Sequence, residues 1–121
     1  MNHIAHVDIP TTDLKKAQRF YGTIFGWRFR PLPSSPDRLA LETGGAVKGF
    51  LTRVSRVSRV PGIVLYVEVP DIDGLLKKVV RSRGKVLQPK HEVPDRGWTA
   101  VIASPDGCTF GLWQPYWFQA A

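Results

Sequence analysis

Three side chains suited to acid–base or metal chemistry lie in two similar segments of the chain, and two of them, both carboxylates, occupy matching places. The first segment is HVDIP at 6–10, which contains His6 and Asp8, and the second is YVEVP at 66–70, which contains Glu68. Imidazole and carboxylate groups bind divalent metals, and they also transfer protons. We therefore expect His6, Asp8 and Glu68 either to hold a divalent metal or to act as acid–base groups, with Asp8 and Glu68 as the candidate catalytic residues.

His6 also has two simpler interpretations. It can line a binding pocket as a hydrogen-bonding group without any metal, or it can be a plain structural residue. We favour the pocket-lining role. Tyr66 is the counterpart of His6 in the second segment. A neutral phenol is a poor metal ligand, so we expect Tyr66 to contact a bound ligand instead.

The repeat implies two copies of one folding unit, each running from an acid-bearing strand into an amphipathic helix. The expected strands are short patterns bounded by Gly and Pro. In the first copy they cover 4–9, 27–30, 38–43 and 47–52, and in the second they cover 63–69, 85–88, 98–103 and 108–114. The expected helices cover 14–26 and 74–82, and loops are expected at 31–37 and 89–97.

These elements predict an α+β fold in which two tandem βαβββ modules form a mixed, eight-stranded cupped sheet with the helices outside. We expect one domain over 1–121, because this length suits a single core. Module one covers 1–55, a linker covers about 53–62, module two covers 63–114, and an aromatic tail covers 115–121. Paired modules often build a site between them, so we expect the function to lie at their junction.

Composition narrows the classes of function. The 121 residues are 43% hydrophobic and carry a formal net charge of +7. No apolar run approaches the roughly 20 residues that span a bilayer, and the N-terminus lacks a signal-peptide pattern. With a single cysteine, Cys108, we expect a cytoplasmic protein that does not act at a membrane. The positive charge favours anions, but no nucleic-acid-binding motif accompanies it, so nucleic acid is not the expected partner.

Two basic and aromatic segments have open roles. Arg53, Arg56 and Arg59 lie in the linker, and they form either a solvated loop or a contact for an anion. Tyr116, Trp117 and Phe118 lie in the tail. Three aromatic side chains at a terminus are unfavourable in water, so we expect them to dock on the body of the protein or on a second subunit.

Several motifs together resemble the vicinal oxygen chelate superfamily, which includes glyoxalase I, bleomycin-resistance proteins, fosfomycin-resistance enzymes and extradiol dioxygenases. His6 precedes Tyr21 by fifteen residues, and the helix ends in Phe25-Gly26. The second module carries Ser-Pro-Asp-Gly at 104–107 and Gly-Leu-Trp-Gln at 111–114. The last motif is similar to a glyoxalase-like subgroup whose members mostly lack an assigned reaction. The resemblance covers nearly the whole chain.

The resemblance implies four strand positions that hold a divalent metal in family enzymes. The first falls on His6, which suits a metal. Its counterpart in module two falls on Val64 or Tyr66, and the two carboxylate positions fall on Gly111 and, by the same count from the hairpin glycine, on Gly49. Because His6 is the only retained ligand, we expect no metal in the family geometry and no cofactor. A divalent metal at a shifted site of His6, Asp8 and Glu68 is the alternative.

The same comparison implies which residues surround a bound molecule. Gly49 and Gly111 would leave space on the floor of the cup. Strand alternation places Trp113 on the face of Gly111, and Trp98 would add an aromatic wall. Both tryptophans have a simpler interpretation as core residues. We thus expect a ligand to contact His6, Tyr66, Trp98, Gly111, Trp113 and Gly49.

Three functions follow from these expectations. The preferred one is a small-molecule-binding protein with a degraded metal site, whose ligand is neutral and aromatic or anionic. The second is a glyoxalase-like lyase or isomerase, with metal at a shifted site as one version. The third is an antibiotic-sequestering resistance protein. The resemblance also implies a homodimer.

Overall fold

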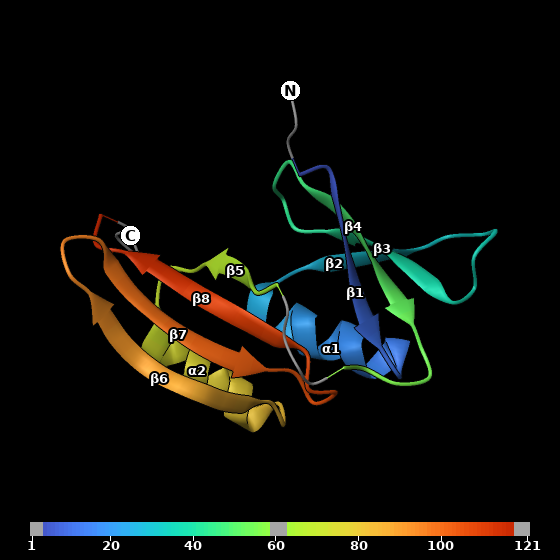
Figure 1. Cartoon of the computed structure of the whole chain (residues 1–121). Coiled ribbons are helices and arrows are strands. Elements are labelled where there is room, and N and C mark those ends of the chain that lie inside the picture. Colours follow the sequence, from blue (N-terminus) through green and yellow to red (C-terminus); the bar gives the residue numbers. More distant parts are fainter. Residues whose placement is uncertain (1–3, 59–62, 118–121) are drawn as a thin grey trace. The chain divides into compact units, whose positions relative to one another are not determined.

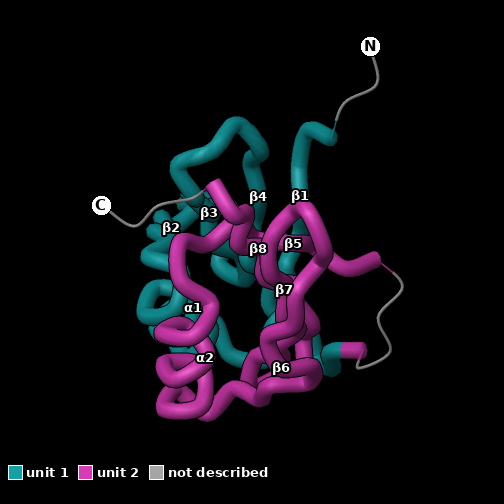
Figure 2. Tube along the Cα trace, turned by 90° about the vertical axis from the view of Figure 1, so that its left-hand side faces the viewer, with its two compact units in different colours: residues 1–57 teal, residues 58–121 magenta. Residues whose placement is uncertain are grey.

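The computed structural model describes residues 4–58 and 63–117, and its contacts divide the chain into two units, 1–57 and 58–121 (Figures 1 and 2). The boundary lies within the segment 53–62 that we assigned to a linker. Each unit is a βαβββ module, and each holds one helix and one four-stranded mixed sheet. The predicted fold class is confirmed. The eight strands form two separate hydrogen-bonded ladders of four.

The first unit begins with a strand that pairs in parallel with its last strand. Its strands are β1 (His6–Thr11), β2 (Arg28–Pro31), β3 (Arg38–Glu42) and β4 (Lys48–Arg53), in the spatial order β1-β4-β3-β2. The helix α1 (Leu14–Phe25) begins where the Asp13 side chain accepts a hydrogen bond from the Lys16 amide at 3.1 Å. It ends at Gly26, whose φ of 70° is the left-handed conformation that glycine adopts without strain.

The core of the first unit lies between α1 and one face of its sheet. Helix residues at spacings of three and four are buried, and they are Ala17, Phe20, Tyr21 and Ile24. From the sheet, Ile9, Leu41 and Leu51 are at most 4% exposed. Their neighbours in each strand, such as Asp8, Glu42 and Thr52, lie on the opposite face because side chains alternate along a strand. We call that second surface, the one away from the helix, the open face.

The second unit repeats this order. Its strands are β5 (Leu65–Glu68), β6 (Lys85–Val93), β7 (Gly97–Ala103) and β8 (Thr109–Pro115), in the order β5-β8-β7-β6, and its helix is α2 (Ile72–Arg81). Ile72 and Val79 of the helix and Ile102 and Leu112 of the sheet are fully buried. The amide of Ile72 donates to Oε1 of Gln114 at 2.8 Å, so a side chain from β8 caps the helix.

Part of the loop predicted over 89–97 is a strand. Residues 89–93 continue β6, which the sequence placed only at 85–88. The pairing with β7 shifts register between Val86 and Gln88 and again between Gln88 and His91. Pro89 lies within this irregular stretch. β6 is the last strand in its sheet, and an edge strand with bulges accommodates a residue that lacks an N–H donor.

Candidate functional site

The open face of the first sheet brings together side chains from all four strands. The registers place His6 opposite Lys48, Asp8 opposite Phe50, and Ala40 opposite Phe50. The same face holds Arg38 of β3, together with Arg28 and Arg30 of β2. Most of these groups are charged and exposed, so this surface carries the polar chemistry of the unit.

His6 and Asp8 form a hydrogen-bonded pair on this face. Nε2 of His6 lies 2.9 Å from Oδ1 of Asp8, and their side chains are 40% and 60% exposed. An ionised carboxylate only accepts hydrogen bonds, so this contact assigns the ring proton to Nε2 and leaves Nδ1 as the acceptor in neutral His6. The pair could therefore accept a proton from a bound molecule.

Phe50 lies at the centre of the same face. The His6 ring meets it edge-on, with centroids 4.7 Å apart and an interplanar angle of 77°. The guanidinium carbon of Arg38 lies 5.6 Å from the centre of the Phe50 ring. Such geometry matches the edge-to-face and cation–π arrangements that stabilise aromatic clusters. The imidazole is thus held from two directions, by Asp8 and by Phe50.

The open face of the second sheet carries Tyr66 and Glu68 of β5. Tyr66 is opposite Gly111 and Glu68 is opposite Trp113, while Thr99 of β7 is the other neighbour of Trp113. The structure therefore places Trp113 on the face that the alternation predicted. It also places Glu68 beside an indole, away from the helix.

The Tyr66 ring lies directly over Gly111. A Cβ atom at position 111 would be 2.6 Å from Cζ of Tyr66 and closer still to two other ring carbons. Only glycine at position 111 leaves room for the Tyr66 ring, which is itself 59% exposed. The position at which the resemblance implies a carboxylate is occupied by the aromatic ring of the neighbouring strand. Tyr66 and Trp113 thus share one face with Glu68.

The expectation for Gly49 was wrong. Gly49 pairs with Val7 and Leu41, on the face that packs toward α1, and it is buried. A Cβ atom there would lie 2.7 Å from the Val7 carbonyl oxygen and 3.1 Å from Cδ2 of Leu41. It therefore opens no space for a ligand. The structural counterpart of Gly111 in the first unit is Lys48, because Lys48 is the residue opposite His6.

Trp98 was expected to add an aromatic wall to the ligand site, but the structure does not place it on the same face as Trp113. Trp98 pairs with Glu92 and Gln114, one step out of phase with Thr99 and Trp113, so it lies on the helix face. Nζ of Lys90 lies 4.7 Å from the centre of a Trp98 ring, and Lys90 bonds Asp73 of α2 at 2.9 Å. Trp98 is therefore part of the scaffold that holds the sheet to its helix.

The aromatic tail docks in part on this scaffold. The Tyr116 ring meets Trp98 edge-on at 6.1 Å, its amide donates to the Arg96 carbonyl, and its hydroxyl donates to Glu92. Trp117 is 71% exposed, and Phe118, like Arg59 of the linker, lies outside the described residues. In the described part of the linker, Arg53 pairs with Asp37 and Arg56 is exposed.

The hydrogen bond to Glu92 raises the pKa of Tyr116 to about 12 from its usual 10.0, with smaller contributions from burial and from the charges of Glu92 and Asp95. Because the neutral phenol is favoured in the folded state, this contact stabilises the fold below pH 10 and is lost as the pH rises through about 12. We expect Glu92→Gln to move the phenolate transition of Tyr116 down toward 10. Ultraviolet titration of both proteins, with Tyr116→Phe identifying the transition, measures this. An unchanged transition in Glu92→Gln would exclude the contact.

The donor set does not match a standard metal site. A metal needs three or four converging side chains, and no three His, Cys, Asp or Glu side chains of the described ranges come together as ligands. His6 and Asp8 offer two donors, while Gly111 and its partner Tyr66 offer only a phenol. The cluster that adds Glu68 to His6 and Asp8 spans both units, and it stays a prediction.

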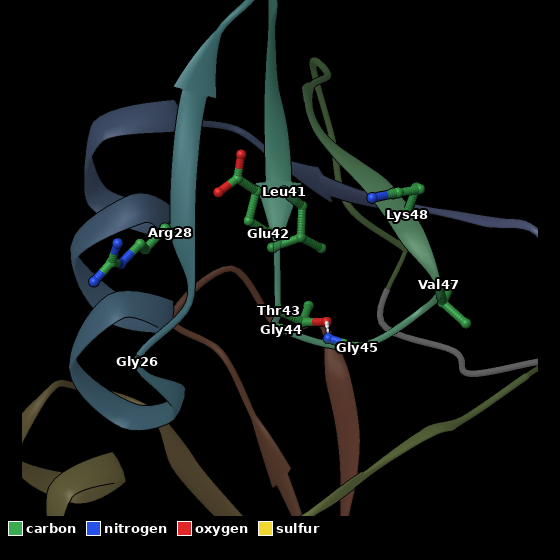
Figure 3. Close-up of a pocket in the computed structure, with 9 residues that line it drawn as sticks. All are labelled: Gly26, Arg28, Leu41, Glu42, Thr43, Gly44, Gly45, Val47 and Lys48. Carbon is green, nitrogen blue, oxygen red and sulfur yellow. Dashed lines mark hydrogen bonds between the residues drawn. The ribbon is translucent and has the colours of Figure 1, made fainter.

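A pocket of about 460 Å³ lies at one end of the first sheet (Figure 3). Its lining comes from the residue that ends α1, from β2, from the adjoining ends of β3 and β4, and from the connection between these two strands. The charged side chains are Arg28, Glu42 and Lys48. Sequence reasoning missed these residues, together with Phe50 and Arg38. The alternation of β4 and its pairing with β1 would have placed Lys48 and Phe50 beside His6 and Asp8, had the register been known.

The chain is similar to known proteins over most of its length. Residues 3–44 match the family described as Bleomycin resistance protein-like N-terminal. CFP32 of Mycobacterium tuberculosis, whose name assigns it provisionally to the glyoxylases, is 33% identical over 114 residues, which cover 89% of this chain and 44% of CFP32. The chain thus spans less than half of this curated relative.

Two solved structures show the same fold. A glyoxalase-related enzyme from Fulvimarina pelagi has a TM-score of 0.75 at 23% identity, with 94% of this chain and 88% of that one covered. TnmS3, an antibiotic binding protein from Streptomyces sp. CB03234, has a TM-score of 0.67 at 24% identity, with 95% and 97% covered. Within the described ranges, neither helix has the length and apolar character needed to cross a membrane.

Proposed function

The chain belongs to the vicinal oxygen chelate superfamily of glyoxalases, bleomycin-resistance proteins and dioxygenases, and we propose that it binds a small organic molecule on its open sheet faces without the standard metal. The observation that carries this proposal is the Tyr66 ring over Gly111. It replaces a carboxylate position with an aromatic surface. An aromatic surface with a few polar groups is the usual composition of a small-molecule site.

The ligand that these faces suit is neutral and aromatic or anionic. Tyr66 and Trp113 offer ring surfaces on the second unit, and Phe50 does so on the first. The formal charge of +7 repels cations at long range and attracts anions. Antibiotic sequestration is a related form of the proposed function, because TnmS3, an antibiotic binding protein, has the same fold. For the same reason of charge, an antibiotic held here would be neutral or anionic.

Fragment binding to the Tyr66 surface tests the proposal. We expect neutral aromatic fragments such as indole to shift the amide resonances of 66–68 and 111–113 saturably. Tyr66→Ala is expected to weaken this binding about tenfold, because stacking on one aromatic side chain contributes on the order of 1–3 kcal/mol. Tyr116→Ala is the matched control, since Tyr116 lies on the helix face of the same unit.

Metal analysis of protein purified without chelators supplies the opposing outcome. We expect far less than one Zn, Ni, Mn or Fe per chain. Near-stoichiometric metal that disappears in His6→Ala would overturn the metal-free proposal. If the Tyr66→Ala and wild-type proteins bound fragments equally, the aromatic surface at Tyr66 would not be the binding site.

The His6–Asp8 hydrogen bond supports a second candidate, a glyoxalase-like lyase or isomerase. In this version the pair, or Glu68 of the second unit, accepts a proton from the substrate. Turnover of a 2-oxoaldehyde with a thiol would then be lost in Asp8→Asn or Glu68→Gln while the fold stays intact. Activity that neither substitution changes would exclude both carboxylates. A homodimer and a cytoplasmic location stay predictions.

A further inference from the structure

The open face of the first sheet carries an imbalance of charge. Its cationic side chains are Arg28, Arg30, Arg38 and Lys48, and its carboxylates are Asp8 and Glu42. Each carboxylate already has a partner. Asp8 bonds His6, and Glu42 forms an ion pair with Arg30. Within the described ranges no carboxylate pairs with Arg28 or Lys48. Positive charge therefore remains without an internal counterion at the end of the sheet.

The 460 Å³ pocket lies where this charge remains. Its one carboxylate is Glu42, and the Arg30 that neutralises Glu42 is not among the lining residues. Figure 3 shows Lys48 extending from β4 toward β3, whereas Arg28 extends from β2 away from the hairpin, at the rim. A volume of this size falls in the range of small-molecule sites, roughly 300–1,000 Å³. Lys48 is thus the central cation and Arg28 a peripheral one.

The hairpin supplies room and a further donor. Gly44 and Gly45 contribute no side chains to the pocket, and Gly44 has a φ of 87°, which glycine accepts readily. The Gly45 amide donates to Oγ1 of Thr43 at 3.2 Å, as the dashed line in Figure 3 shows. A hydroxyl that accepts one hydrogen bond keeps its own proton to donate. Thr43 can therefore direct that proton to an anion.

Lys48 also connects the pocket to the rest of the open face. It pairs with His6, and Phe50 lies two residues further along β4 on the same face. At about 3.3 Å per residue, the two side chains arise roughly 7 Å apart. That separation suits a molecule with an acidic group at one end and a ring at the other.

We propose that this pocket binds the oxyanion of a small aromatic acid, a carboxylate or a phosphate monoester, with Lys48 and Thr43 as its main contacts and Arg28 as a peripheral charge, and that the ring of the ligand extends beyond the lining residues to lie beside Phe50. This inference rests on the proposed function, because it names the ligand class of one of the two open faces. Charge-assisted hydrogen bonds to an ammonium are stronger than neutral ones, so Lys48 carries most of the discrimination.

Benzoate, phenyl phosphate, inorganic phosphate and benzyl alcohol, added at constant ionic strength and followed by amide resonances, test the proposal. We expect benzoate and phenyl phosphate to shift the amide resonances of residues 43–48 and of Phe50 saturably. Benzyl alcohol, which has no charge, is expected to bind at these residues at least about tenfold more weakly. The comparison of the first two distinguishes carboxylate from phosphate. Inorganic phosphate shows whether the anion alone suffices.

Matched variants separate a local site from general charge. Lys48→Gln is expected to weaken the binding of benzoate or phenyl phosphate about fivefold, and Arg28→Gln is expected to weaken it less. Lys77→Gln removes the same charge from α2 and is expected to change nothing. Equal weakening by Lys48→Gln and Lys77→Gln, or shifts that avoid 43–48, would overturn this inference. Neutral fragments still bound at Tyr66 in that case would leave the proposed function standing.

Discussion

Gly49→Ala is expected to destabilise the protein by about 3 kcal/mol, as overpacking of a close-packed interior does. The new Cβ would lie 2.7 Å from the backbone oxygen of Val7 and 3.0 Å from its Cγ2. The oxygen belongs to the neighbouring strand, so relief requires that β1 and β4 move apart and that Leu41, whose Cδ2 would lie 3.1 Å from the new Cβ, repacks. Urea unfolding followed by circular dichroism measures the loss of stability.

Gly111→Ala is the matched comparison. The atoms in its way belong to the Tyr66 ring, which is 59% exposed and can rotate into solvent. We expect a smaller cost, about 1 kcal/mol, together with loss of fragment binding at Tyr66. Equal destabilisation by the two substitutions would contradict the assignment of Gly49 to the core and Gly111 to the surface.

These two glycines show where the sequence comparison failed. Each lies four residues after a hairpin glycine, Gly45 or Gly107. The structure instead matches Lys48 with Gly111, because these are the residues opposite His6 and Tyr66. Counted from the hairpin glycine, these residues lie three positions on in the first unit and four positions on in the second. Since side chains alternate, an error of one position moves a residue to the other face of the sheet.

Features fixed by local chemistry were predicted correctly. The sequence repeat predicted two βαβββ modules, and the helix expected over 14–26 is α1, which ends at Gly26. The phase of β8 placed Trp113 on the open face. Local patterns could not predict contacts between strands, such as the seat of Tyr66 on Gly111 or the cap that Gln114 gives to α2.

The sequence also could not predict which cationic side chains stay available to the proposed ligand. Seventeen Lys and Arg residues give a basic protein, but not a site. Only the structure shows that Arg30 neutralises Glu42 and that Arg53 pairs with Asp37, whereas no carboxylate of residues 4–58 and 63–117 pairs with Lys48. Exposed ion pairs contribute little to stability, about 0–1 kcal/mol each. Their importance here is that they determine which cations remain for a ligand.

Leu112→Ala is expected to lower the free energy of unfolding by about 2–5 kcal/mol, through lost apolar burial and the cavity left behind. Leu112 is fully buried on the helix face of β8, between Gly111 and Trp113 on the open face. Leu87→Ala removes the same atoms from a side chain that is 51% exposed, and it should change stability by less than about 0.5 kcal/mol. Urea unfolding measures both.

The same variant separates the scaffold from the binding surface. Because Leu112 and Trp113 point to opposite faces, folded Leu112→Ala protein at low temperature should bind neutral aromatic fragments with nearly wild-type affinity. Trp113→Leu should show the reverse, a small change in stability with weakened fragment binding. If Leu112→Ala lost binding while folded, or if Trp113→Leu destabilised the protein as much as Leu112→Ala, then β8 would not divide core from site, and the small-molecule surface on the second unit would have to be withdrawn.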